Sequence, residues 1–315
     1  MNFLIIVYKG IGDVILTTPL VKAIKKNFPS SKVFFLTKKY SSSILKNNPY
    51  VDEIIVREEM RLIDLMSKGI DVSIDTMLSS SSAFFSLLSG AKKRVAFFRN
   101  WGFLVYNCMI KSQWHGYNVI KRLEYLKVFG IDWRNIKDIK PEIYPAPCDF
   151  ENVKKTLERY LIYPGRDKIV SFDITSPRKE RQLPADIFIY CADRLVEMGF
   201  KSLFMPAAWD YEYVISSIKR YSSHPDRYVV IKDFSILELS AAISFADIHI
   251  GTSSAPMHIA VAFDVPTFTL YTPQVNPISW SPPFPHHRWI QSEISKIDKF
   301  DVWKAIERQI DTLNL

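Results

Sequence analysis

The chain of 315 residues is 48% hydrophobic and 23% charged, and its formal net charge is +8. This length is sufficient for two domains that each bury a core, and the composition excludes a disordered chain. Three widely spaced cysteines without a CxxC pair argue against a disulfide framework or a zinc site and favour the reducing cytoplasm. No apolar run reaches the roughly 18–20 residues that span a bilayer, and no signal-peptide cleavage site follows the short apolar run at the N-terminus.

The positive charge comes from 41 basic residues against 33 acidic ones. Such an excess attracts polyanions: nucleic acid, anionic lipid surfaces or phosphorylated substrates. Charge alone does not choose among them. Because the cations are scattered and no RNP, helix-turn-helix or zinc-finger signature is present, we expect no nucleic-acid partner.

Short apolar strands alternate with helical segments from the first residues on. The strand Phe3–Tyr8 is followed by Gly10 and Gly12, and helical spacing runs over Val14–Lys25, where Pro19 should kink or delay the helix. The alternation continues with the strands Lys32–Thr37, Val51–Val56 and Asp71–Asp75 and an apolar helix around Phe84–Leu88. This pattern predicts right-handed βαβ crossovers and a mainly parallel sheet.

A cluster of prolines between residues 141 and 164 separates a second half of the same kind, which begins with the strand Lys168–Phe172. We therefore predict a boundary near residues 145–165 and divide the chain into domains 1–155 and 156–315. The closing helix, Lys299–Leu313, follows a Pro- and aromatic-rich loop, and whether it packs back on the first domain is left open. The remaining predicted elements are the strands Lys201–Met205, Tyr228–Ile231, Asp247–Gly251 and Thr267–Tyr271, and the helices Ala185–Met198, Tyr211–Tyr221, Leu237–Ser244 and Pro256–Phe263.

Open α/β sheets bind ligands at the carboxyl ends of their strands, so functional residues are expected in the loops that follow. The first such loop is Lys9-Gly10-Ile11-Gly12-Asp13. Its glycines let the backbone turn and approach a ligand closely, and Asp13 projects from the start of a helix. The third glycine of a GxGxxG motif is missing, so no dinucleotide site is expected. The alternative is that Asp13 only stabilises the helix N-terminus.

A second loop runs from Gly251 to His258 and reads GTSSAPMH. Pro256 suits the first turn of a helix, whose free backbone N–H groups and neighbouring hydroxyls would bind a diphosphate. Alternatively, Ser253 or Ser254 is only the N-cap. His258 either contacts a phosphate or packs beneath the loop.

A third candidate follows the strand Lys168–Phe172. There, the hydroxyls of Thr175 and Ser176 precede the cations Arg178, Lys179 and Arg181. Hydroxyls and cations at the carboxyl end of a strand suit phosphate binding, although a solvated basic loop would have the same composition.

In this order, the segments resemble glycosyltransferase family 9, the lipopolysaccharide heptosyltransferases. The first and last motifs are specific as an ordered pair, whereas each alone is weak. The matching segments are GIGDVILTTPLVKAIKKNFPSSKVFFLT, NNPYVDEIIV, VIKRLEYLKVFGI, RKERQLPADIFIYCADRL and ADIHIGTSSAPMHIAVAFDVPTFTLYTP.

The resemblance implies an α/β fold of GT-B type, in which two Rossmann-like domains face each other. The first would hold the acceptor, a lipid-linked oligosaccharide, and the second the nucleotide-sugar donor, which the family's pattern suggests is ADP-heptose. The transfer would invert the anomeric configuration and need no cofactor, and the absence of an Asp-x-Asp at a strand end argues against a metal.

The resemblance also assigns site residues. Asp13 matches the family's proposed base, and Lys9, Gly10 and Gly12 fall on the acceptor side. Asp210 or Glu212 matches an acid that holds the donor's ribose. The full donor set is Thr175, Ser176, Arg181, Asp210, Ser253, Ser254, Ala255, Pro256, Met257 and His258.

The chain departs from the family at two places. Ser253-Ser254-Ala255 stands where the family usually has Asp-Ser/Thr-Gly, and Leu183 replaces an aromatic residue before Pro184. Loss of that carboxylate removes a contact to the donor's hydroxyls. Three alternatives therefore stay open: a degenerate member that binds without catalysis, a transferase or epimerase of the same architecture with another donor, and a nucleic-acid-binding protein.

Membrane contact is expected from the acceptor, at the cytoplasmic face of the inner membrane. The stretch Ala91–Lys111 mixes cations with Phe, Trp and Tyr, as interfacial segments do. The alternative is that these aromatics belong to the core of the first domain and the cations to its rim.

Overall fold

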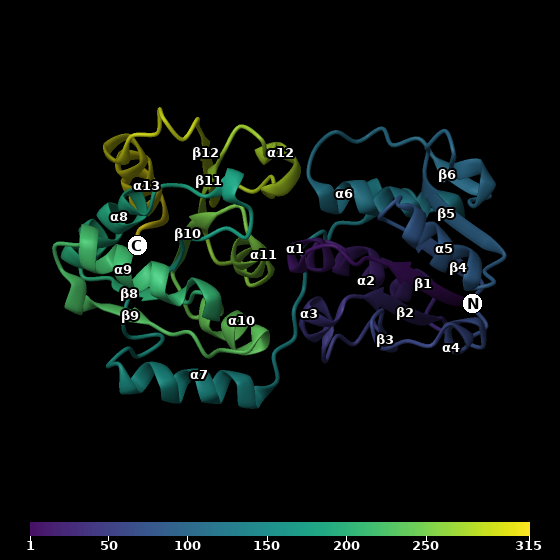
Figure 1. Ribbon diagram of the computed structural model, residues 1–315, viewed down its shortest axis with the longest axis horizontal. Coiled ribbons are helices and arrows are strands. Elements are labelled where there is room, and N and C mark those ends of the chain that lie inside the picture. Colours follow the sequence, from purple (N-terminus) through teal and green to yellow (C-terminus); the bar gives the residue numbers. More distant parts are fainter. The chain divides into compact units, whose positions relative to one another are not determined.

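The computed structural model describes residues 1–315 except for the side chain of Lys179, and it divides into two compact units, Met1–Tyr144 and Pro145–Leu315 (Figure 1). Each unit contains one six-stranded sheet, and all strand pairs in both sheets are parallel. The predicted α/β class with parallel sheets is thus confirmed.

The first unit has the strand order β3-β2-β1-β4-β5-β6. Its strands are β1 (Asn2–Ile6), β2 (Lys32–Thr37), β3 (Glu53–Val56), β4 (Val72–Asp75), β5 (Lys93–Phe97) and β6 (Cys108–Ile110). Its α-helices are α1 (Ile11–Ile15), α2 (Thr18–Asn27), α3 (Lys39–Ser42), α4 (Leu62–Met66), α5 (Ser80–Leu88) and α6 (Asn118–Leu123). Short 3-10 turns complete it at η1 (Ser43–Leu45), η2 (Gly102–Leu104), η3 (Glu124–Phe129) and η4 (Trp133–Asn135).

The second unit has the order β12-β11-β10-β7-β8-β9. Its strands are β7 (Ile169–Asp173), β8 (Lys201–Phe204), β9 (Tyr228–Val230), β10 (Ile248–Thr252), β11 (Thr267–Tyr271) and β12 (His287–Gln291). Its α-helices are α7 (Pro147–Arg159), α8 (Ala185–Glu197), α9 (Tyr211–Tyr221), α10 (Ile236–Ser244), α11 (Ala255–Ala262), α12 (Pro277–Trp280) and α13 (Lys299–Leu313), and its 3-10 turns are η5 (Lys179–Arg181), η6 (Ala208–Asp210) and η7 (Pro225–Arg227).

The two sheets have the same topology. In each, the first strand of the unit lies next to the fourth, so β1 pairs with β4 and β7 pairs with β10. The strand order reverses at that pair, and ligands of doubly wound folds bind at the carboxyl ends of the strands at this switch point. All three loops that the sequence singles out follow β1, β7 or β10, so they lie at the two switch points.

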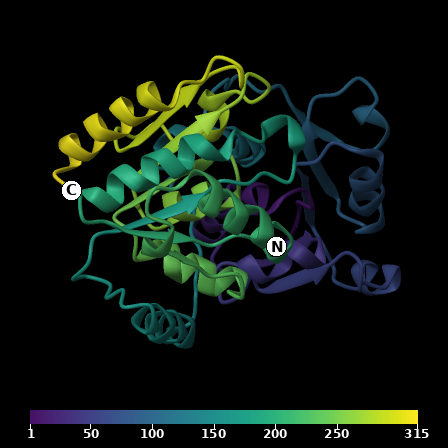
Figure 2. The same cartoon turned by 60° about the vertical axis from the view of Figure 1, so that its left-hand side comes forward.

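The boundary between the units precedes α7, whereas the sequence pattern places it at 155/156. α7 belongs to the second unit because it packs against α10. The closing helix α13 also packs within the second unit, along α8, as Figure 2 shows. Its buried residues Val302, Trp303 and Ile306 join the core cluster that includes Phe188 and Leu195 of α8.

Pro19 delays the second helix as predicted. α1 ends at Ile15, and α2 begins at Thr18 with Pro19 in its first turn, where a missing N–H costs nothing.

Three strands escape prediction from the sequence: β5, β6 and β12. β5 and β6 lie within the stretch 91–111, and β12 begins in the Pro- and aromatic-rich loop. β6 has three residues and lies at a sheet edge, as β12 does, so these two strands lack the long apolar run of a central strand. In β5, only Val95 and Ala96 are fully buried, which leaves too short a pattern to recognise.

Candidate active site

Asp13 lies in the first turn of α1, directly beyond the carboxyl end of β1. Its backbone N–H donates to the carbonyl of Gly10 at 3.0 Å, which fixes the start of the helix. The carboxylate is partly buried, and its Oδ1 accepts a hydrogen bond from Arg122 Nη2 at 2.7 Å. Among the described side chains, Arg122 is the only ion-pair partner of Asp13. The pair therefore orients one carboxylate oxygen and leaves the other for a ligand.

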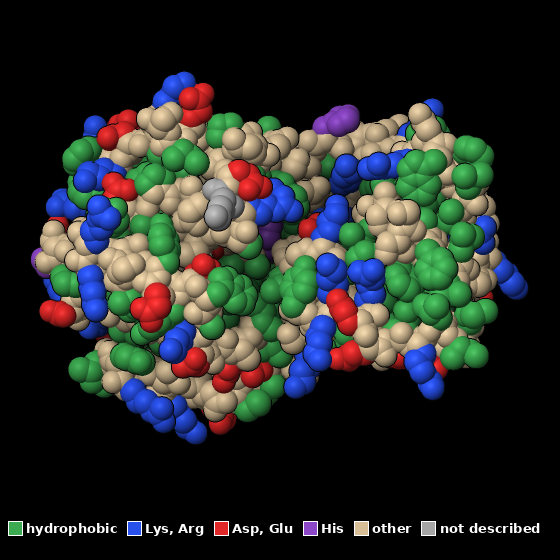
Figure 3. Space-filling model, viewed as in Figure 1, with side chains coloured by type: hydrophobic (Ala, Val, Ile, Leu, Met, Phe, Trp, Pro, Cys, Tyr) green, Lys and Arg blue, Asp and Glu red, His purple; other side chains and the backbone are tan. Residues whose placement is uncertain are grey.

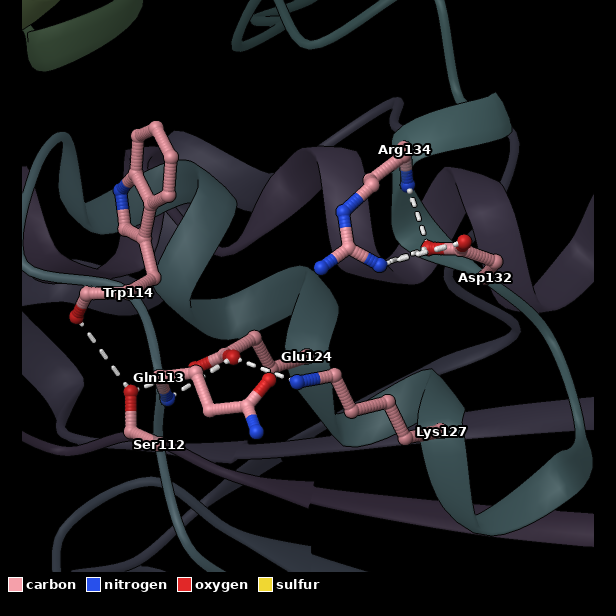
Figure 4. A network of polar contacts seen from close by, with 7 residues as sticks. All are labelled: Ser112, Gln113, Trp114, Glu124, Lys127, Asp132 and Arg134. Carbon is pink, nitrogen blue, oxygen red and sulfur yellow. Dashed lines mark hydrogen bonds and ion pairs between the residues drawn. The ribbon is translucent and has the colours of Figure 1, made fainter.

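Arg122 is buried and comes from α6, and the C-cap residue of this helix, Glu124, ties its end to the segment that follows β6. Glu124, at the start of η3, accepts hydrogen bonds from the Ser112 hydroxyl and, at 3.1 Å, from the Gln113 backbone N–H. It also pairs with Lys127 at 2.7 Å. Figure 4 shows Glu124 between Lys127 and the chain that follows β6. Burial opposes ionisation of Glu124, but these bonds together outweigh it and lower the pKa, so the anchor stays charged.

Tyr40 of α3 contacts the loop Lys9–Asp13 at Lys9. Its hydroxyl donates to the carbonyl oxygen of Lys9 at 2.5 Å. Burial, followed by the negative charges of Asp13 and Glu58, raises the pKa of Tyr40. The phenol therefore remains a protonated hydrogen-bond donor beside the carboxylate.

The glycines of this loop do not supply the tight turn that the sequence suggests. Gly10 is extended, with φ −65° and ψ 165°, a conformation open to any residue. Gly12 lies within α1. A Cβ on Gly10 would have no atom within 4 Å, so this glycine leaves open space beside Asp13 rather than permitting a special backbone conformation.

A carboxylate at the neighbouring strand end is structural. Asp75, the last residue of β4, is fully buried and accepts hydrogen bonds from the Tyr106 hydroxyl and the backbone N–H groups of Met77 and Leu78. Burial raises its pKa. Because Asp75 binds the turn after its own strand, Asp13 is the accessible carboxylate at this switch point.

In the second unit the corresponding carboxylate is Asp173, the last residue of β7. It accepts a hydrogen bond from the Ser254 hydroxyl and weaker ones from Thr252 Oγ1 at 3.5 Å and from the Thr175 backbone N–H at 3.4 Å. Burial raises the pKa of Asp173 to about 6, and these hydrogen bonds oppose the shift. The negative charge of Asp210 adds to it. Asp173 thus titrates close to neutrality, among three hydroxyl-bearing residues.

Gly251 is required by the close approach of β10 to β7. In the register of the sheet it lies opposite Asp173. A Cβ at residue 251 would lie 2.7 Å from the carbonyl oxygen of Asp173 and 3.2 Å from Nε2 of His249. The first of these distances cannot be tolerated without a backbone shift, so only glycine fits at this position.

The loop after β10 presents hydroxyls and a helix N-terminus. Ser254 is the N-cap of α11 by position, but its hydroxyl binds Asp173 instead of the helix. Pro256 lies in the first turn of α11, as predicted. The N–H groups of Ala255 and Met257 belong to this first turn, where backbone donors lack an intrahelical partner.

His258 is buried, and its ring centroid lies 5.8 Å from that of Trp280. This contact favours packing beneath the loop. A second buried histidine, His249, bonds to the Ser171 hydroxyl at 3.0 Å, and burial lowers its pKa to about 3. His249 is therefore neutral under the loop at physiological pH.

The basic loop after β7 is shaped by Gln182. Its side-chain oxygen accepts from the Ser176 backbone N–H at 2.8 Å, and its amide donates to the carbonyl of Ile174 at 2.8 Å. Thr175 is buried, whereas Ser176 and Arg181 are partly exposed. The side chain of Lys179 lies outside the described part of the structure. Thr175, Thr252 and Ser254 donate hydrogen bonds to Asp173, and the charge of Asp210 acts on it, whereas Ser176 bonds Gln182 on the same loop.

No candidate metal centre accompanies these loops. Among the described residues, no group of three His, Cys, Asp or Glu side chains is placed to hold a metal ion. The carboxylates at the strand ends bind protein donors: Asp13 binds Arg122, Asp75 binds Tyr106, and Asp173 binds Ser254.

The comparisons with known proteins agree with this arrangement. The model of glycosyltransferase family 9 (heptosyltransferase) matches residues 62–307. The chain belongs to glycosyltransferase family 9.

Relatives and solved structures of low sequence identity support the membership of this glycosyltransferase in family 9. Lipopolysaccharide heptosyltransferase 1 of Campylobacter coli is 21% identical over 295 residues, 86% of this chain and 84% of the relative. The structure of a family 9 glycosyltransferase from Veillonella parvula has a TM-score of 0.87 at 19% identity and covers 99% of this chain and 97% of its own. The Escherichia coli ADP-heptose lipopolysaccharide heptosyltransferase II has a TM-score of 0.81 at 15% identity, with 100% of both chains covered. The fold is of GT-B type.

Sequence reasoning misses three polar residues of this glycosyltransferase: Arg122, Tyr40 and Asp173. Asp173 could have been found, because the carboxyl-end rule applies to the last residue of a strand as well as to the loop behind it. Arg122 and Tyr40 carry no local signal. Each reaches the Asp13 loop from a distant segment, and only the folded chain brings them there.

Proposed function

We propose that this glycosyltransferase transfers a heptose-like sugar from a nucleotide diphosphate, ADP-heptose in the first instance, to a lipopolysaccharide core or related glycan, with inversion at the anomeric carbon. The names of its relatives support the sugar and the acceptor. The observation that carries the proposal is the Asp13 carboxylate, held at the carboxyl end of β1 by Arg122 with one oxygen left for a ligand.

Asp13 would act as the general base. The unpaired oxygen of Asp13 would accept the proton of the acceptor hydroxyl. The hydroxyl oxygen of the acceptor would attack the anomeric carbon at the same time, from the face opposite the diphosphate. Arg122 fixes the carboxylate and compensates its charge before the proton arrives. Base catalysis of this kind contributes about 10²–10⁴ in rate.

The second unit would bind the donor and stabilise the departing diphosphate. The N–H groups in the first turn of α11 would bind the negative charge that develops on the diphosphate, and Ser176 and Arg181, on the loop after β7, would add to this. Asp210, whose charge acts on Asp173, is positioned near the same strand end and would accept from the ribose hydroxyls.

Asp173 would supply the carboxylate that position 253 lacks. The family usually has an acid where this chain has Ser253, and Asp173 reaches the next residue of the same loop, Ser254, from β7. A carboxylate that approaches the loop from another strand meets the donor's hydroxyls from a different direction. We therefore propose that Asp173 determines which sugar is accepted.

A second candidate is a degenerate member that binds a glycan or nucleotide without turnover. Ser253 and Ala255 favour it, because both alter the loop that would hold the donor. Another GT-B transferase or epimerase with a different donor is the remaining alternative.

The test is a thermal-shift screen with ADP-, UDP- and GDP-sugars, followed by product analysis with the donor that binds. ADP-heptose should raise the melting temperature most and be consumed only when acceptor is present. Stabilisation without product would favour the binding protein, and product from a UDP-sugar alone would contradict the donor that we propose. We also propose that no metal is needed, so a chelator should leave turnover unchanged.

We propose a cytoplasmic protein that contacts the inner membrane transiently, because the acceptor is anchored there. In the part of the chain that the structure describes, no helix combines the length and the apolar character needed to cross a bilayer.

A further inference from the structure

The first unit exposes a concentration of large apolar side chains on one surface. Nine of the large apolar residues that the described part of the chain leaves exposed fall between Leu62 and Leu104. Figure 3 shows apolar side chains gathered over α4, α5 and the β5–β6 region, with Lys and Arg around them. We call the central part of this surface the apolar platform, which consists of Phe84, Leu87, Phe98, Trp101, Phe103 and Leu104.

The platform comes from two segments that are fixed to each other below the surface. Ala83 of α5 belongs to one buried cluster with Val105 and Tyr106, which follow η2. Phe103 and Leu104 of η2 are 68% and 72% exposed, so the same short turn is anchored on one side and open on the other. Large apolar side chains in contact with water are unfavourable, so a partner that covered them would gain free energy from the apolar surface it buries.

The electrostatics of this segment are one-sided. Between Thr76 and Leu123 the sequence contains seven Lys or Arg residues and no Asp or Glu. Lys92, Arg99 and Lys111 are exposed, and none of them forms an ion pair with a described acid. The Lys111 ammonium lies 5.4 Å from the ring centroid of Phe98, at the margin of the platform.

Position in the fold links this surface to the Asp13 loop. Phe98, Arg99 and Trp101 follow the carboxyl end of β5, and Lys111 follows that of β6. Because all strands of the sheet are parallel, these residues leave the sheet at the edge where Lys9–Asp13 follows β1. A partner surface bound to the platform would therefore bring its own molecules close to the Asp13 carboxylate.

We infer that the apolar platform docks on an anionic lipid bilayer. Aromatic and aliphatic side chains would enter the interface between headgroups and acyl chains, and Lys92, Arg99 and Lys111 would contact lipid phosphates. Because the segment carries cations and no acids, it is complementary in charge to anionic lipid. A second copy of this basic chain would lack that complementarity. The inference rests on the proposed lipid-anchored acceptor, but it concerns binding and not chemistry.

The experiment is vesicle co-sedimentation of the full chain, without donor or acceptor, on phosphatidylcholine vesicles with and without phosphatidylglycerol. The wild-type protein should bind the anionic vesicles, and added salt should weaken binding. Each cation near an anionic surface contributes about fivefold to partitioning, so Lys92→Gln/Arg99→Gln/Lys111→Gln should lose at least tenfold. Phe103→Ser/Leu104→Ser should lose a comparable amount.

Matched controls remove the same chemistry elsewhere: Ile278→Ser/Ile294→Ser for the apolar pair and Lys155→Gln/Lys219→Gln/Lys304→Gln for the cations, all exposed residues of the second unit. These should bind as the wild type does. Equal loss in the control variants, or no binding of anionic vesicles, would overturn the inference. So would a dimer in solution that Phe103→Ser/Leu104→Ser converts to monomer.

Turnover on a soluble, delipidated acceptor separates this inference from the proposed function. Both platform variants should keep wild-type turnover on that acceptor. If the wild-type protein binds vesicles but never forms product, the docking inference holds and the proposed transferase function is refuted. If it forms product but does not bind vesicles, the transferase function holds and the docking inference is refuted.

Discussion

The two units share one strand order but carry opposite chemistry at their switch points. In the first, a carboxylate is held in an ion pair with Arg122. In the second, a carboxylate with a pKa of about 6 lies among hydroxyls, and the neighbouring strand carries a neutral histidine, His249. The same edge of the sheet thus presents an ion-paired carboxylate in one unit and a hydrogen-bonded carboxylate in the other. Fold decides where a site lies, and the side chains at the strand ends decide what it does.

The largest effect is expected from removing the charge at the first switch point. Asp13→Asn keeps the shape and loses the base, so kcat should fall by about 10²–10⁴. Donor affinity, measured by calorimetry, should stay within about twofold if the second unit binds the donor. Asp64→Asn, on α4, is the control and should keep wild-type turnover. An active Asp13→Asn protein would remove the basis of the proposed mechanism.

The two switch points also differ in how tightly their glycines are enclosed. Gly251→Ala places a Cβ 2.7 Å from a backbone oxygen, so we expect a loss of about 1–3 kcal/mol in the free energy of unfolding and weaker donor binding. Gly10→Ala meets nothing within 4 Å and should leave stability unchanged within about 0.5 kcal/mol. Denaturant titration measures both. A destabilising Gly10→Ala would mean that the first loop is more constrained than its geometry indicates.

The titration of Asp173 gives the second unit a pH dependence. Its folded-state pKa of about 6 lies above the ordinary value of 3.8, so the native state binds the proton more tightly than the unfolded state. Stability from this group is complete below about pH 4 and is lost as the pH rises through about 6. Asp173→Asn cannot ionise, so its melting temperature should rise relative to the wild type between pH 4 and pH 7.

The full shift corresponds to about 3 kcal/mol, and because the side chain is only partly buried we expect on the order of half of it. Thermal melts of both proteins at several pH values measure the difference. If that difference is the same at acid and neutral pH, Asp173 does not titrate in this range.

Two helix caps should have equal effects in the two units. Ser79 caps α5 and Ser235 caps α10 through the same bond, in which the serine Oγ accepts from the N–H three residues on at 3.2 Å. Ser79→Ala and Ser235→Ala should each lower the free energy of unfolding by about 1 kcal/mol. A clear inequality in chemical denaturation would indicate that the two units do not unfold together.

Most of the fold could be predicted because buried strands and amphipathic helices leave a periodic signal. The strands β6 and β12 escaped because they lie at sheet edges, and β5 escaped because only Val95 and Ala96 of its five residues are buried. The loops of the site could be placed from strand ends alone. The partners inside the site could not, since Tyr40 and Arg122 reach the Asp13 loop through contacts that no local window contains.

The ion pair of Asp13 and Arg122 joins residues 109 positions apart in the sequence. Asp13 follows the first strand, and Arg122 comes only after all six strands of the unit have been synthesised. A nascent or truncated chain that ends before α6 would carry the carboxylate without the cation that orients it. The oriented carboxylate of this unit is therefore acquired last, once the whole sheet can form, so the ion pair depends on the integrity of the whole unit rather than of the loop alone.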